Sequence, residues 1–424
     1  MTRDPEVVFR ELAVRHDRMF WLDGGGARNW SGRRSIMGAL DEDDVSLTYD
    51  ATAREVTRHR TGRSEVIGDD VFACLEAELA HDAGDSRVSW VGYFGYACRP
   101  DLPARTADRG APDAVWMRVR DPLVFHHAPG SPTVADPVGA ATTVRRPAGD
   151  VPAGYRRAYD EVQEQLRAGN SYEVNLTYRE ALTSPVDPVT AYLRLRRLSP
   201  APYAGFLQHH GTRLLSSSPE RYATVDRRGW LETRPIKGTT PRGRTPAEDA
   251  KLSRSLAEDP RYRAENLMIV DLLRNDLSMV CEPGTVTVPD LMEVESYPSV
   301  HQLVSTVRGH LRDGVSTVSA LRALFPAGSM TGAPKLRTMQ VIADVEESPR
   351  GVYAGAFGWI SGDGRADLGV VIRSLVVSEP DGDADGGWRY ELGTGGGITV
   401  RSDLESEYAE TRWKAERLRR AVEP

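Results

Sequence analysis

The stretch GVYAGAFGWISGDGRADLGVVIRSLVV, residues 351–377, decides which kind of fold the chain can form. Two apolar runs flank the turn made by Ser361, Gly362, Asp363 and Gly364. A short glycine-rich turn between two apolar runs predicts two strands joined as a hairpin. This stretch therefore supplies strands to a fold in which helices are also predicted.

Predicted helices precede and follow this hairpin in the sequence. Apolar residues at helical spacing between Tyr155 and Leu166, followed by Gly169, predict one helix and its end. Asp259 and Pro260 are the N-cap and the first residue of a second predicted helix. Strands and helices come in separate blocks and do not alternate as in a βαβ protein, which favours an α+β fold over a doubly wound sheet.

One more strand and the last helix complete this pattern. An alternation of residues predicts a half-buried strand, formed by Tyr172, Val174, Leu176 and Tyr178. Ser402 and Glu405 have the spacing of a capping box at the start of the last helix. The apolar stripe of that helix consists of Leu404, Tyr408, Ala415 and Leu418.

The composition excludes several classes of protein. Of the 424 residues, 40% are hydrophobic and 27% are charged, which is enough to build a core, and a net charge of −7 argues against a nucleic-acid-binding protein. The three cysteines, Cys74, Cys98 and Cys281, form no C-x-x-C pair, so neither a disulfide framework nor a structural zinc site is expected. The N-terminus lacks a secretory h-region and no apolar segment could span a membrane, so we expect a cytoplasmic protein.

The chain divides at one change of composition. Residues 126–153 are rich in proline, alanine and glycine without a sustained apolar period, which predicts a surface loop or linker. This segment separates an N-terminal region, residues 1–125, from a C-terminal region, residues 154–424.

Lysine is rare in this chain, so each lysine is a candidate for a specific role. Only four of the 54 basic residues are lysine, and one of them, Lys237, lies in the segment RPIKGTTPRG, residues 234–243. A desolvated lysine can lose its proton and act as a nucleophile, whereas arginine stays charged. The alternative is an exposed turn that happens to contain a lysine.

Carboxylates on two predicted helices form a candidate metal site. Glu407, Glu410 and Lys414 are spaced so that they share one face of the last helix, and Glu265 lies early in another helix. Two glutamates from two helices could hold Mg²⁺, which takes few protein oxygens and keeps waters or substrate oxygens. The alternative is a solvated helix face with an ion pair between Glu410 and Lys414.

Two glycine-containing segments could contact a ligand. The run GTGGGI, residues 393–398, offers backbone N–H groups at close range but lacks the G-x-G-x-x-G spacing of a dinucleotide site, and a tight turn explains it equally well. The segment GSMTGAPK, residues 328–335, fails the phosphate-loop pattern and leaves open a carboxylate bound at a helix N-terminus. No pattern typical of a zinc enzyme or a serine hydrolase is present.

Together these segments resemble the chorismate-utilising enzymes and, among them, component I of the aminodeoxychorismate synthases. The N-terminal region matches more faintly, through FWLDGGG and GRRSIMG. The resemblance implies an α+β fold similar to anthranilate synthase component I, a large two-sheet antiparallel β-sandwich flanked by helices. The N-terminal region would complete the sandwich, and the active site would lie between the sheets. The matching segments, which are spread through the C-terminal region 154–424 from residue 216 to residue 411, are SSSPERY, TRPIKGTTPRG, RAENLMIVDLLRND, PSVHQLVSTV, FPAGSMTGAPKLRTMQVI, DLGVVIRSL and GTGGGITVRSDLESEYAET.

The resemblance also implies a reaction. Aminodeoxychorismate synthases carry P-I-K-G-T where anthranilate synthases carry P-I-A-G-T, so Lys237 would attack C2 of chorismate while Glu220 protonates the departing C4 hydroxyl. Ammonia would then add at C4 and expel the lysine, giving 4-amino-4-deoxychorismate for p-aminobenzoate biosynthesis, which leads either to folate or to a specialised aromatic-amine pathway. This chemistry needs a neutral lysine and a protonated glutamate at the same pH.

The same resemblance implies a metal site and substrate contacts. Glu265 and Glu410 would bind Mg²⁺, with Glu407 as an outer partner, next to the ring carboxylate of the substrate. Arg373 interrupts an apolar strand expected over residues 368–377, where a substrate carboxylate would satisfy its charge. The positions similar to substrate-contacting ones are Gly238, Thr239, Ser329, Tyr353, Arg373, Gly395, Gly396, Gly397 and Lys414.

Two positions depart from patterns seen in relatives. Tyr262 stands where some relatives have an acidic residue, three positions before the metal glutamate, and Gln302 stands where anthranilate synthases have histidine. No cysteine lies in an amidotransferase nucleophile context, so ammonia would come from a separate glutamine amidotransferase subunit or from solution. The alternatives are an enzyme that makes anthranilate, aminodeoxyisochorismate or isochorismate and, in another class, a non-catalytic partner-binding homologue.

Overall fold

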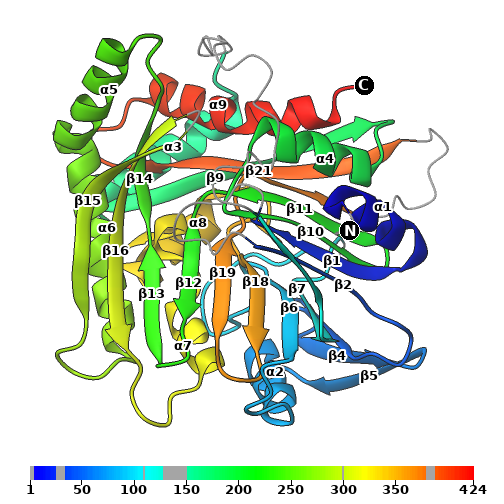
Figure 1. The fold of residues 1–424 in the computed structure, drawn as a ribbon. Helices are drawn as coiled ribbons and strands as arrows, with labels where there is room; N and C mark the ends of the chain where they lie inside the picture. The colour runs from blue at the N-terminus through cyan, green and yellow to red at the C-terminus, as the bar shows by residue number, and fades with distance from the viewer. Residues whose placement is uncertain (1–3, 25–33, 108–109, 128–149, 298–299, 379–386) are drawn as a thin grey trace.

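The computed structural model describes residues 4–24, 34–107, 110–127, 150–297, 300–378 and 387–424, which form two large antiparallel sheets with helices on their outer faces (Figure 1). The described strands of sheet A lie in the order β17 (Gly332–Ala333), β9 (Glu173–Ser184), β21 (Trp388–Ile398), β20 (Ser374–Val377), β11 (Thr212–Ser218), β10 (Tyr203–His209), β1 (Arg18–Asp23), β2 (Arg34–Ala39) and β8 (Leu123–His126).

Sheet B is the larger of the two sheets. Its long strand β16 pairs with β13 and β14 along one edge and with β15 along the other. The predicted α+β fold with two antiparallel sheets is therefore confirmed. The described strands of sheet B are β14 (Ile236–Pro241), β16 (Val300–His310), β13 (Trp230–Arg234), β12 (Arg221–Val225), β19 (Ala366–Val370), β18 (Ala356–Ser361), β6 (Val88–Phe94), β7 (Ala114–Arg120), β3 (Ser46–Asp50), β4 (Glu55–Arg60), β5 (Arg63–Gly68) and β15 (Thr287–Ser296).

The hairpin predicted in residues 351–377 is present, but the strand expected over residues 368–377 is not. Strands β18 and β19 pair antiparallel, with Ala356 opposite Val370 and Ile360 opposite Ala366. The chain then leaves sheet B, and β20 begins in sheet A. Arg373, with a φ of 50°, is the last residue before β20. One apolar run therefore supplies strands to both sheets, because apolar residues are needed in both.

Strand β9 differs in burial from the predicted half-buried strand. Val174 and Leu176 pack against helices on the outer face of sheet A, as the alternation predicts. Glu173, Asn175 and Thr177, on the other face, are also buried, whereas Tyr172 is exposed. The start of β9 is thus covered on both sides, with polar residues pointing between the sheets.

The helices begin where the local sequence provides caps. Asp259 caps α6 through the N–H of Arg261, as predicted. The capping box predicted for α9 is wrong, because the N-cap is Asp403 and it accepts a hydrogen bond from the N–H of Ser406 at 3.0 Å. The described helices are α1 (Pro5–Arg15), α2 (Val71–Ala80), α3 (Ala153–Arg167), α4 (Pro188–Leu198), α5 (Pro246–Glu258), α6 (Pro260–Ser278), α7 (Thr317–Leu324), α8 (Lys335–Val345) and α9 (Leu404–Val422), with a 3₁₀ turn at Gly328–Met330.

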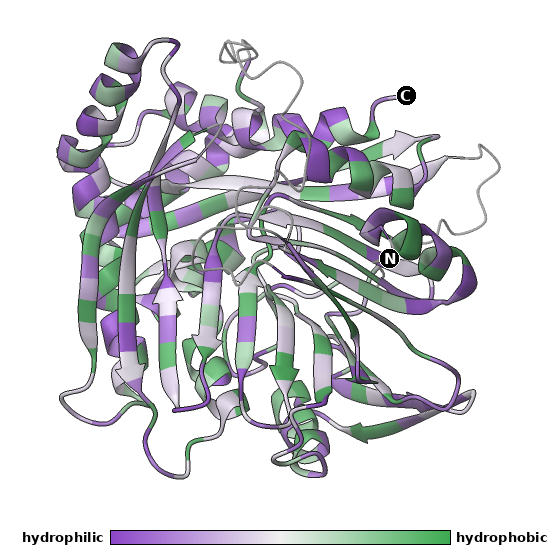
Figure 2. Ribbon diagram, in the orientation of Figure 1, coloured by the Kyte–Doolittle hydropathy of each residue, from purple (hydrophilic) through white to green (hydrophobic). Residues whose placement is uncertain are grey.

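The core has an inner layer between the sheets and outer layers beneath the helices. Phe20, Val91 and Phe357 belong to the inner layer. Trp21, one position along β1 from Phe20, packs outward beneath α1, α4 and α9. Side chains of successive strand residues point to opposite faces, so hydrophobic bands appear along strands of both sheets (Figure 2). No helix in the described ranges has the length and apolar character needed to cross a membrane.

The N-terminal region contributes one end of each sheet. Strands β1, β2 and β8 extend sheet A beyond β10, and β3 to β7 extend sheet B beyond β18. Most of the linker predicted at residues 126–153 lies outside the described residues.

Candidate active site

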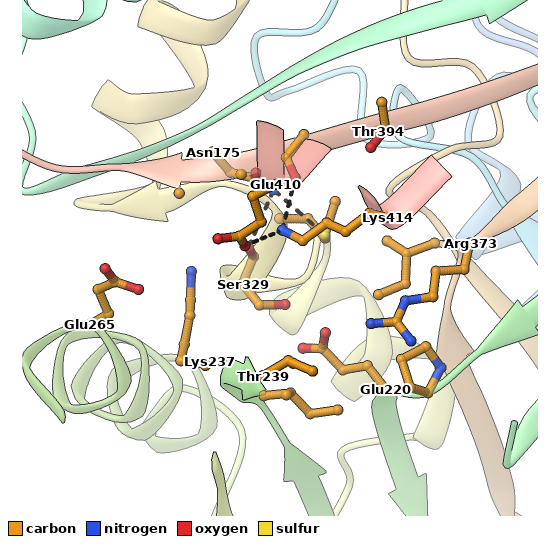
Figure 3. A pocket seen from close by; sticks show the side chains of 18 of the residues that line it. Asn175, Glu220, Lys237, Thr239, Glu265, Ser329, Arg373, Thr394, Glu410 and Lys414 are labelled. Carbon is orange, nitrogen blue, oxygen red and sulfur yellow. Dashed lines mark hydrogen bonds and ion pairs between the residues drawn. The ribbon is translucent and has the colours of Figure 1, made fainter. Parts of the chain in front are cut away.

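A cavity lies between the two sheets, with α6 and α9 on its border (Figure 3). Its empty space, including some of the open solvent at its mouth, is about 1000 Å³. All the residues with a predicted role in the site line this cavity: Glu220, Lys237, Gly238, Thr239, Glu265, Ser329, Tyr353, Arg373, Gly395, Gly396, Gly397, Glu407, Glu410 and Lys414. The fold thus brings together segments that are up to about two hundred residues apart in the sequence.

Lys237 is buried and paired, so it is not part of an exposed turn. It lies on β14 of sheet B, and its ammonium contacts the carboxylate of Glu173 on β9 of sheet A. Burial by itself would lower the pKa of Lys237, but the negative charges of Glu173 and Glu265 outweigh it and raise that pKa. The lysine therefore holds its proton in this state, whereas nucleophilic attack requires a neutral amine.

Glu220 has the opposite electrostatic situation. It precedes β12, and its side chain faces the same cavity as Lys237 (Figure 3). Burial raises the pKa of Glu220 to about 7, although a hydrogen bond from Ser329 and the charges of Lys237 and Arg373 oppose this shift. A carboxyl with such a pKa keeps its proton in part of the molecules at neutral pH and can act as an acid.

Three glutamates border the cavity on the α6 and α9 side. Glu265 has no hydrogen bond or ion pair to any described residue, and burial raises its pKa to about 7. Burial and the charge of Glu410 also raise the pKa of Glu407, whose carboxylate accepts a hydrogen bond from Ser402 at 2.8 Å. Across the described ranges, no three acidic, histidine or cysteine side chains are close enough to form a complete metal cluster.

Glu410 forms the ion pair that the sequence suggested as an alternative to metal binding. Its carboxylate lies 2.9 Å from Lys414 Nζ, and this lysine also donates to the carbonyl oxygen of Gly395 at 3.0 Å. The charge of Lys414 lowers the pKa of Glu410. The pair faces the cavity and not the solvated outer face of α9, since both residues line the cavity.

The glycine run is part of strand β21, which contradicts its interpretation as a tight turn. Gly395, Gly396 and Gly397 pair with Thr177, Leu176 and Asn175 of β9. A Cβ atom at Gly397 would lie 2.2 Å from Glu173 Oε1 and 3.2 Å from Lys237 Nζ. The absence of a side chain therefore leaves room for the Lys237–Glu173 pair.

Arg373 and Ser329 approach the cavity from other segments. Arg373 occupies the crossing between the sheets and points into the cavity toward Glu220 (Figure 3). Ser329 and Met330 are the only members of the segment 328–335 among the described residues that line the cavity. Lys335 instead donates to Asp276 and to the carbonyl oxygen of Leu324, each at 2.7 Å. The helix N-terminus considered as a carboxylate site therefore does not line the cavity.

The sequence interpretation missed several residues of this site. Glu173 contacts Lys237, while Asn175 and Arg261 line the cavity. One sequence signal for these residues was the alternation along β9. Val174 and Leu176 pack into the core on one face of the strand, so the polar residues 173, 175 and 177 must lie on the other face. Tyr262 and Gln302, noted as departures from relatives, also line the cavity.

The site and the two-sheet fold define a class of protein, and the sequence identifies the same class. Residues 19–420 match the family described as chorismate binding enzyme, so the chain belongs to this family. Aminodeoxychorismate synthase from Streptomyces pristinaespiralis is 39% identical to it, over 97% of the chain and 63% of that protein. Aminodeoxychorismate synthase component 1 from Salmonella typhimurium is 41% identical, over 63% of the chain and 57% of that protein.

A solved structure has the same fold. Anthranilate synthase component I from Streptococcus pneumoniae TIGR4 superposes with a TM-score of 0.74 and 25% sequence identity, covering 91% of this chain and 92% of that one. The chain spans less than two thirds of the length of its Streptomyces relative. Membership of the family and the fold, both predicted by the resemblance, are confirmed.

Proposed function

We propose that the chain is the chorismate-binding subunit of an aminodeoxychorismate synthase, which converts chorismate and ammonia into 4-amino-4-deoxychorismate. The observation that carries this proposal is the placement of Lys237 and Glu220 in one cavity, with the pKa of Glu220 raised to about 7. A nucleophile and an acid that face one substrate are what the exchange of a ring hydroxyl for an amine requires. The names of the Streptomyces and Salmonella relatives support the same reaction.

Lys237 and Glu220 divide the chemistry between them. The amine of Lys237 attacks C2 of chorismate, and the protonated carboxyl of Glu220 gives its proton to the C4 hydroxyl, which leaves as water. Ammonia then adds at C4, and the bond between C2 and the lysine nitrogen breaks. Glu220 is suited to the acid role because burial keeps its proton at a pH where an exposed glutamate is ionised.

Glu265 and Glu410 are the residues that would hold Mg²⁺, with Glu407 as an outer partner. The fit rests on Glu265, a half-buried carboxylate that forms no hydrogen bond or ion pair with any described residue, since such a group is costly without a cation. Mg²⁺ needs only one or two protein carboxylates when substrate oxygens complete its shell. Bound there, the ion would withdraw electron density through the ring carboxylate of the substrate.

The remaining cavity residues would orient the substrate. Arg373 and Lys414 supply positive charge for its carboxylates. Backbone atoms and small or polar side chains would contact the ring; they belong to Gly238, Thr239, Ser329, Tyr353, Gly395, Gly396 and Gly397. Tyr353 is held in place by the guanidinium of Arg179, which lies 4.7 Å from its ring centre.

The nitrogen donor would come from a partner. The Salmonella relative is named as component 1 of its enzyme, which supports a second component, and we propose a glutamine amidotransferase that supplies ammonia. The product would then enter p-aminobenzoate and folate biosynthesis or a related aromatic-amine pathway. Three free cysteines fit the reducing cytoplasm as the site of action.

The second candidate is anthranilate synthesis, the activity named for the pneumococcal structure. Lys237 and Gln302 favour the first candidate, because both line the cavity at positions where anthranilate synthases carry different residues. The product formed by the purified chain from chorismate, ammonium and Mg²⁺ distinguishes the two. We expect 4-amino-4-deoxychorismate by mass spectrometry, whereas fluorescent anthranilate or released pyruvate would contradict the proposal.

The same assay tests the metal. Product formation is expected to require Mg²⁺ and to fall at least a hundredfold in Glu410→Ala, with unchanged circular dichroism. Full activity of Glu410→Ala at all Mg²⁺ concentrations would place the metal elsewhere. With the cognate amidotransferase added, glutamine should replace ammonium as nitrogen donor.

A further inference from the structure

Glu173 lies behind Lys237 and outside the lining of the cavity. Its carboxylate is 1% exposed and contacts Lys237 Nζ across the space between the sheets. Within the described part of the chain, it is the one acceptor at hydrogen-bonding distance from this nitrogen. A substrate that fills the cavity would cover Lys237 and leave Glu173 in place behind it.

The backbone holds Glu173 firmly. The residue is opposite Ala333 of β17, and the next residue, Val174, is opposite Ile398 of β21, so the start of β9 is paired on both edges. The hydroxyl of Ser171 donates to the carbonyl oxygen of Glu173 at 2.9 Å. Gly397 adds a close backbone surface on one side of the carboxylate. Glu173 therefore cannot move far from Lys237 during the reaction.

One oxygen of this carboxylate has no hydrogen-bond partner. Glu173 Oε2 is buried without a hydrogen bond to any described group, and Lys237 is the one described cation at ion-pair distance from the carboxylate. A buried ion pair with incomplete hydrogen bonding is costly, and moving one proton from the ammonium to the carboxylate leaves both groups neutral. The arrangement can therefore produce a neutral lysine without releasing a proton to water.

We propose that Glu173 accepts a proton from Lys237 as the lysine attacks C2 of the substrate, and returns it at the end of the cycle; this inference rests on the proposed function. In the first half, the ammonium of Lys237 gives one proton to Glu173, and the neutral amine forms the bond to C2. The C4–O bond breaks, and the hydroxyl takes the proton of Glu220 and leaves as water. The lysine nitrogen is then a positively charged secondary ammonium.

The second half restores every group. Ammonia forms a bond to C4, the bond between C2 and the lysine nitrogen breaks, and Lys237 leaves as a neutral amine. Glu173 returns its proton to this amine, and the new ammonium group on C4 gives one proton to Glu220. The sum is chorismate and ammonia converted into 4-amino-4-deoxychorismate and water, with no proton exchanged with solvent.

A purely electrostatic role of Glu173 predicts the opposite effect of its removal. The carboxylate, with Glu265 and Glu220 near the same lysine, raises the pKa of Lys237 and so disfavours the neutral amine. If this were its whole effect, Glu173→Gln would increase the neutral fraction of Lys237 and speed the attack. If Glu173 is the proton acceptor, Glu173→Gln removes the acceptor and slows the attack.

The experiment measures formation of the Lys237 adduct by quenched-flow mass spectrometry with chorismate and Mg²⁺ but without ammonia. Glu173→Gln is expected to slow the adduct about a hundredfold or more at pH 7, the usual contribution of a positioned base. Below pH 7 its rate should rise about tenfold per pH unit, because the proton must now be lost to solvent before the attack, whereas above pH 7 the loss of the Glu220 proton offsets this gain. Glu173→Asp, which keeps a carboxylate, should retain the wild-type pH dependence at a lower rate.

Glu180→Gln is the matched control. Glu180 lies seven residues further along β9 and pairs with Arg419 at 2.6 Å, outside the cavity. Its replacement breaks an ion pair on the same strand and should leave the adduct rate unchanged. A Glu173→Gln rate equal to or above wild type would overturn the inference, as would a slower rate with an unchanged pH dependence, which indicates misplacement of Lys237.

The outcomes separate this inference from the proposed function. If the wild-type protein forms the product but no adduct on Lys237, covalent catalysis fails and the role of Glu173 fails with it. If the wild type forms the adduct and Glu173→Gln forms it equally fast, the proposed function stands and only the role of Glu173 is wrong.

Discussion

At the scale of single residues, Glu220 combines an acid role with a thermodynamic cost that depends on pH. Its pKa rises from 4.5 to about 7 because folding removes the carboxyl from water. The folded state therefore keeps this proton in a pH range where the unfolded state has lost it. The contribution of Glu220 to the free energy of unfolding therefore falls as the pH rises from about 5 through 7.

Replacing Glu220 by glutamine should remove this dependence. We expect the free energy of unfolding of Glu220→Gln, relative to wild type, to increase by about 2 kcal/mol between pH 5 and pH 8. Urea denaturation of both proteins across this range measures the difference. Glu405→Gln, at a side chain that is 66% exposed, is the control and should show little change. A difference that stays constant with pH would contradict a buried, proton-holding Glu220.

Residues of a type that is rare in the chain are easier to predict as site residues than the residues that contact them. Lys237 is one of four lysines in an arginine-rich chain and lies in a distinctive motif, so it could be singled out. Glu173 is one glutamate among many, and its role depends on the contact between β9 in sheet A and β14 in sheet B. The alternation along β9 indicates only that Glu173 faces away from the apolar side of the strand, and no local pattern in either strand indicates that it meets Lys237.

At the scale of elements, strand β21 explains why glycines occur at the site. A Cβ at Gly397 would lie 2.2 Å from Glu173 Oε1, whereas a Cβ at Gly396 would meet its nearest atoms at 3.4 and 3.9 Å. Gly397→Ala must therefore displace the Lys237–Glu173 pair, while Gly396→Ala needs little adjustment. The two glycines are neighbours, so they form a matched comparison.

We expect Gly397→Ala to lower kcat/KM for chorismate at least tenfold more than Gly396→Ala. The reason is that the first substitution moves the attacking nitrogen and the second adds a methyl group in ordinary contact with its neighbours. Steady-state kinetics at saturating ammonium, with urea denaturation of both variants, separates this effect from a loss of folding. Equal losses in the two variants would mean that the space at Gly397 does not serve the pair.

Element boundaries were predicted where the signal is local and were wrong where tertiary structure decides. The N-cap Asp259 follows from its own side chain and the proline after it. At the start of the last helix, Ser402 and Asp403 are both suitable N-cap residues. Asp403 takes this position, while the hydroxyl of Ser402 donates a hydrogen bond to the carboxylate of Glu407 at 2.8 Å. Likewise, the apolar run 368–377 gives no sign that it changes sheets, since both sheets bury the same types of residue.

At the scale of the whole molecule, the sandwich is built from two ends that each contain part of both sheets. The seam, where strands of the N-terminal region pair with strands of the C-terminal region, lies between β1 and β10 in sheet A and between β6 and β18 in sheet B. The layer between the sheets crosses this seam, because Phe20 and Val91 on one side pack in the same cluster as Leu207 and Phe357 on the other. Neither end encloses this layer alone.

The C-terminal region is therefore expected not to fold without the N-terminal region. Residues 150–424 alone would expose the edges of β10 and β18 and half of the inner layer, so no cooperative unfolding transition should be seen by near-ultraviolet circular dichroism. As a control, a protease site is inserted into the full chain between His127 and Asp150, where it interrupts no described element. After cleavage at this site, the two pieces should stay together and unfold in one transition. A cooperative transition of residues 150–424 alone, with chorismate turnover, would show that the site needs only its own end of the sandwich.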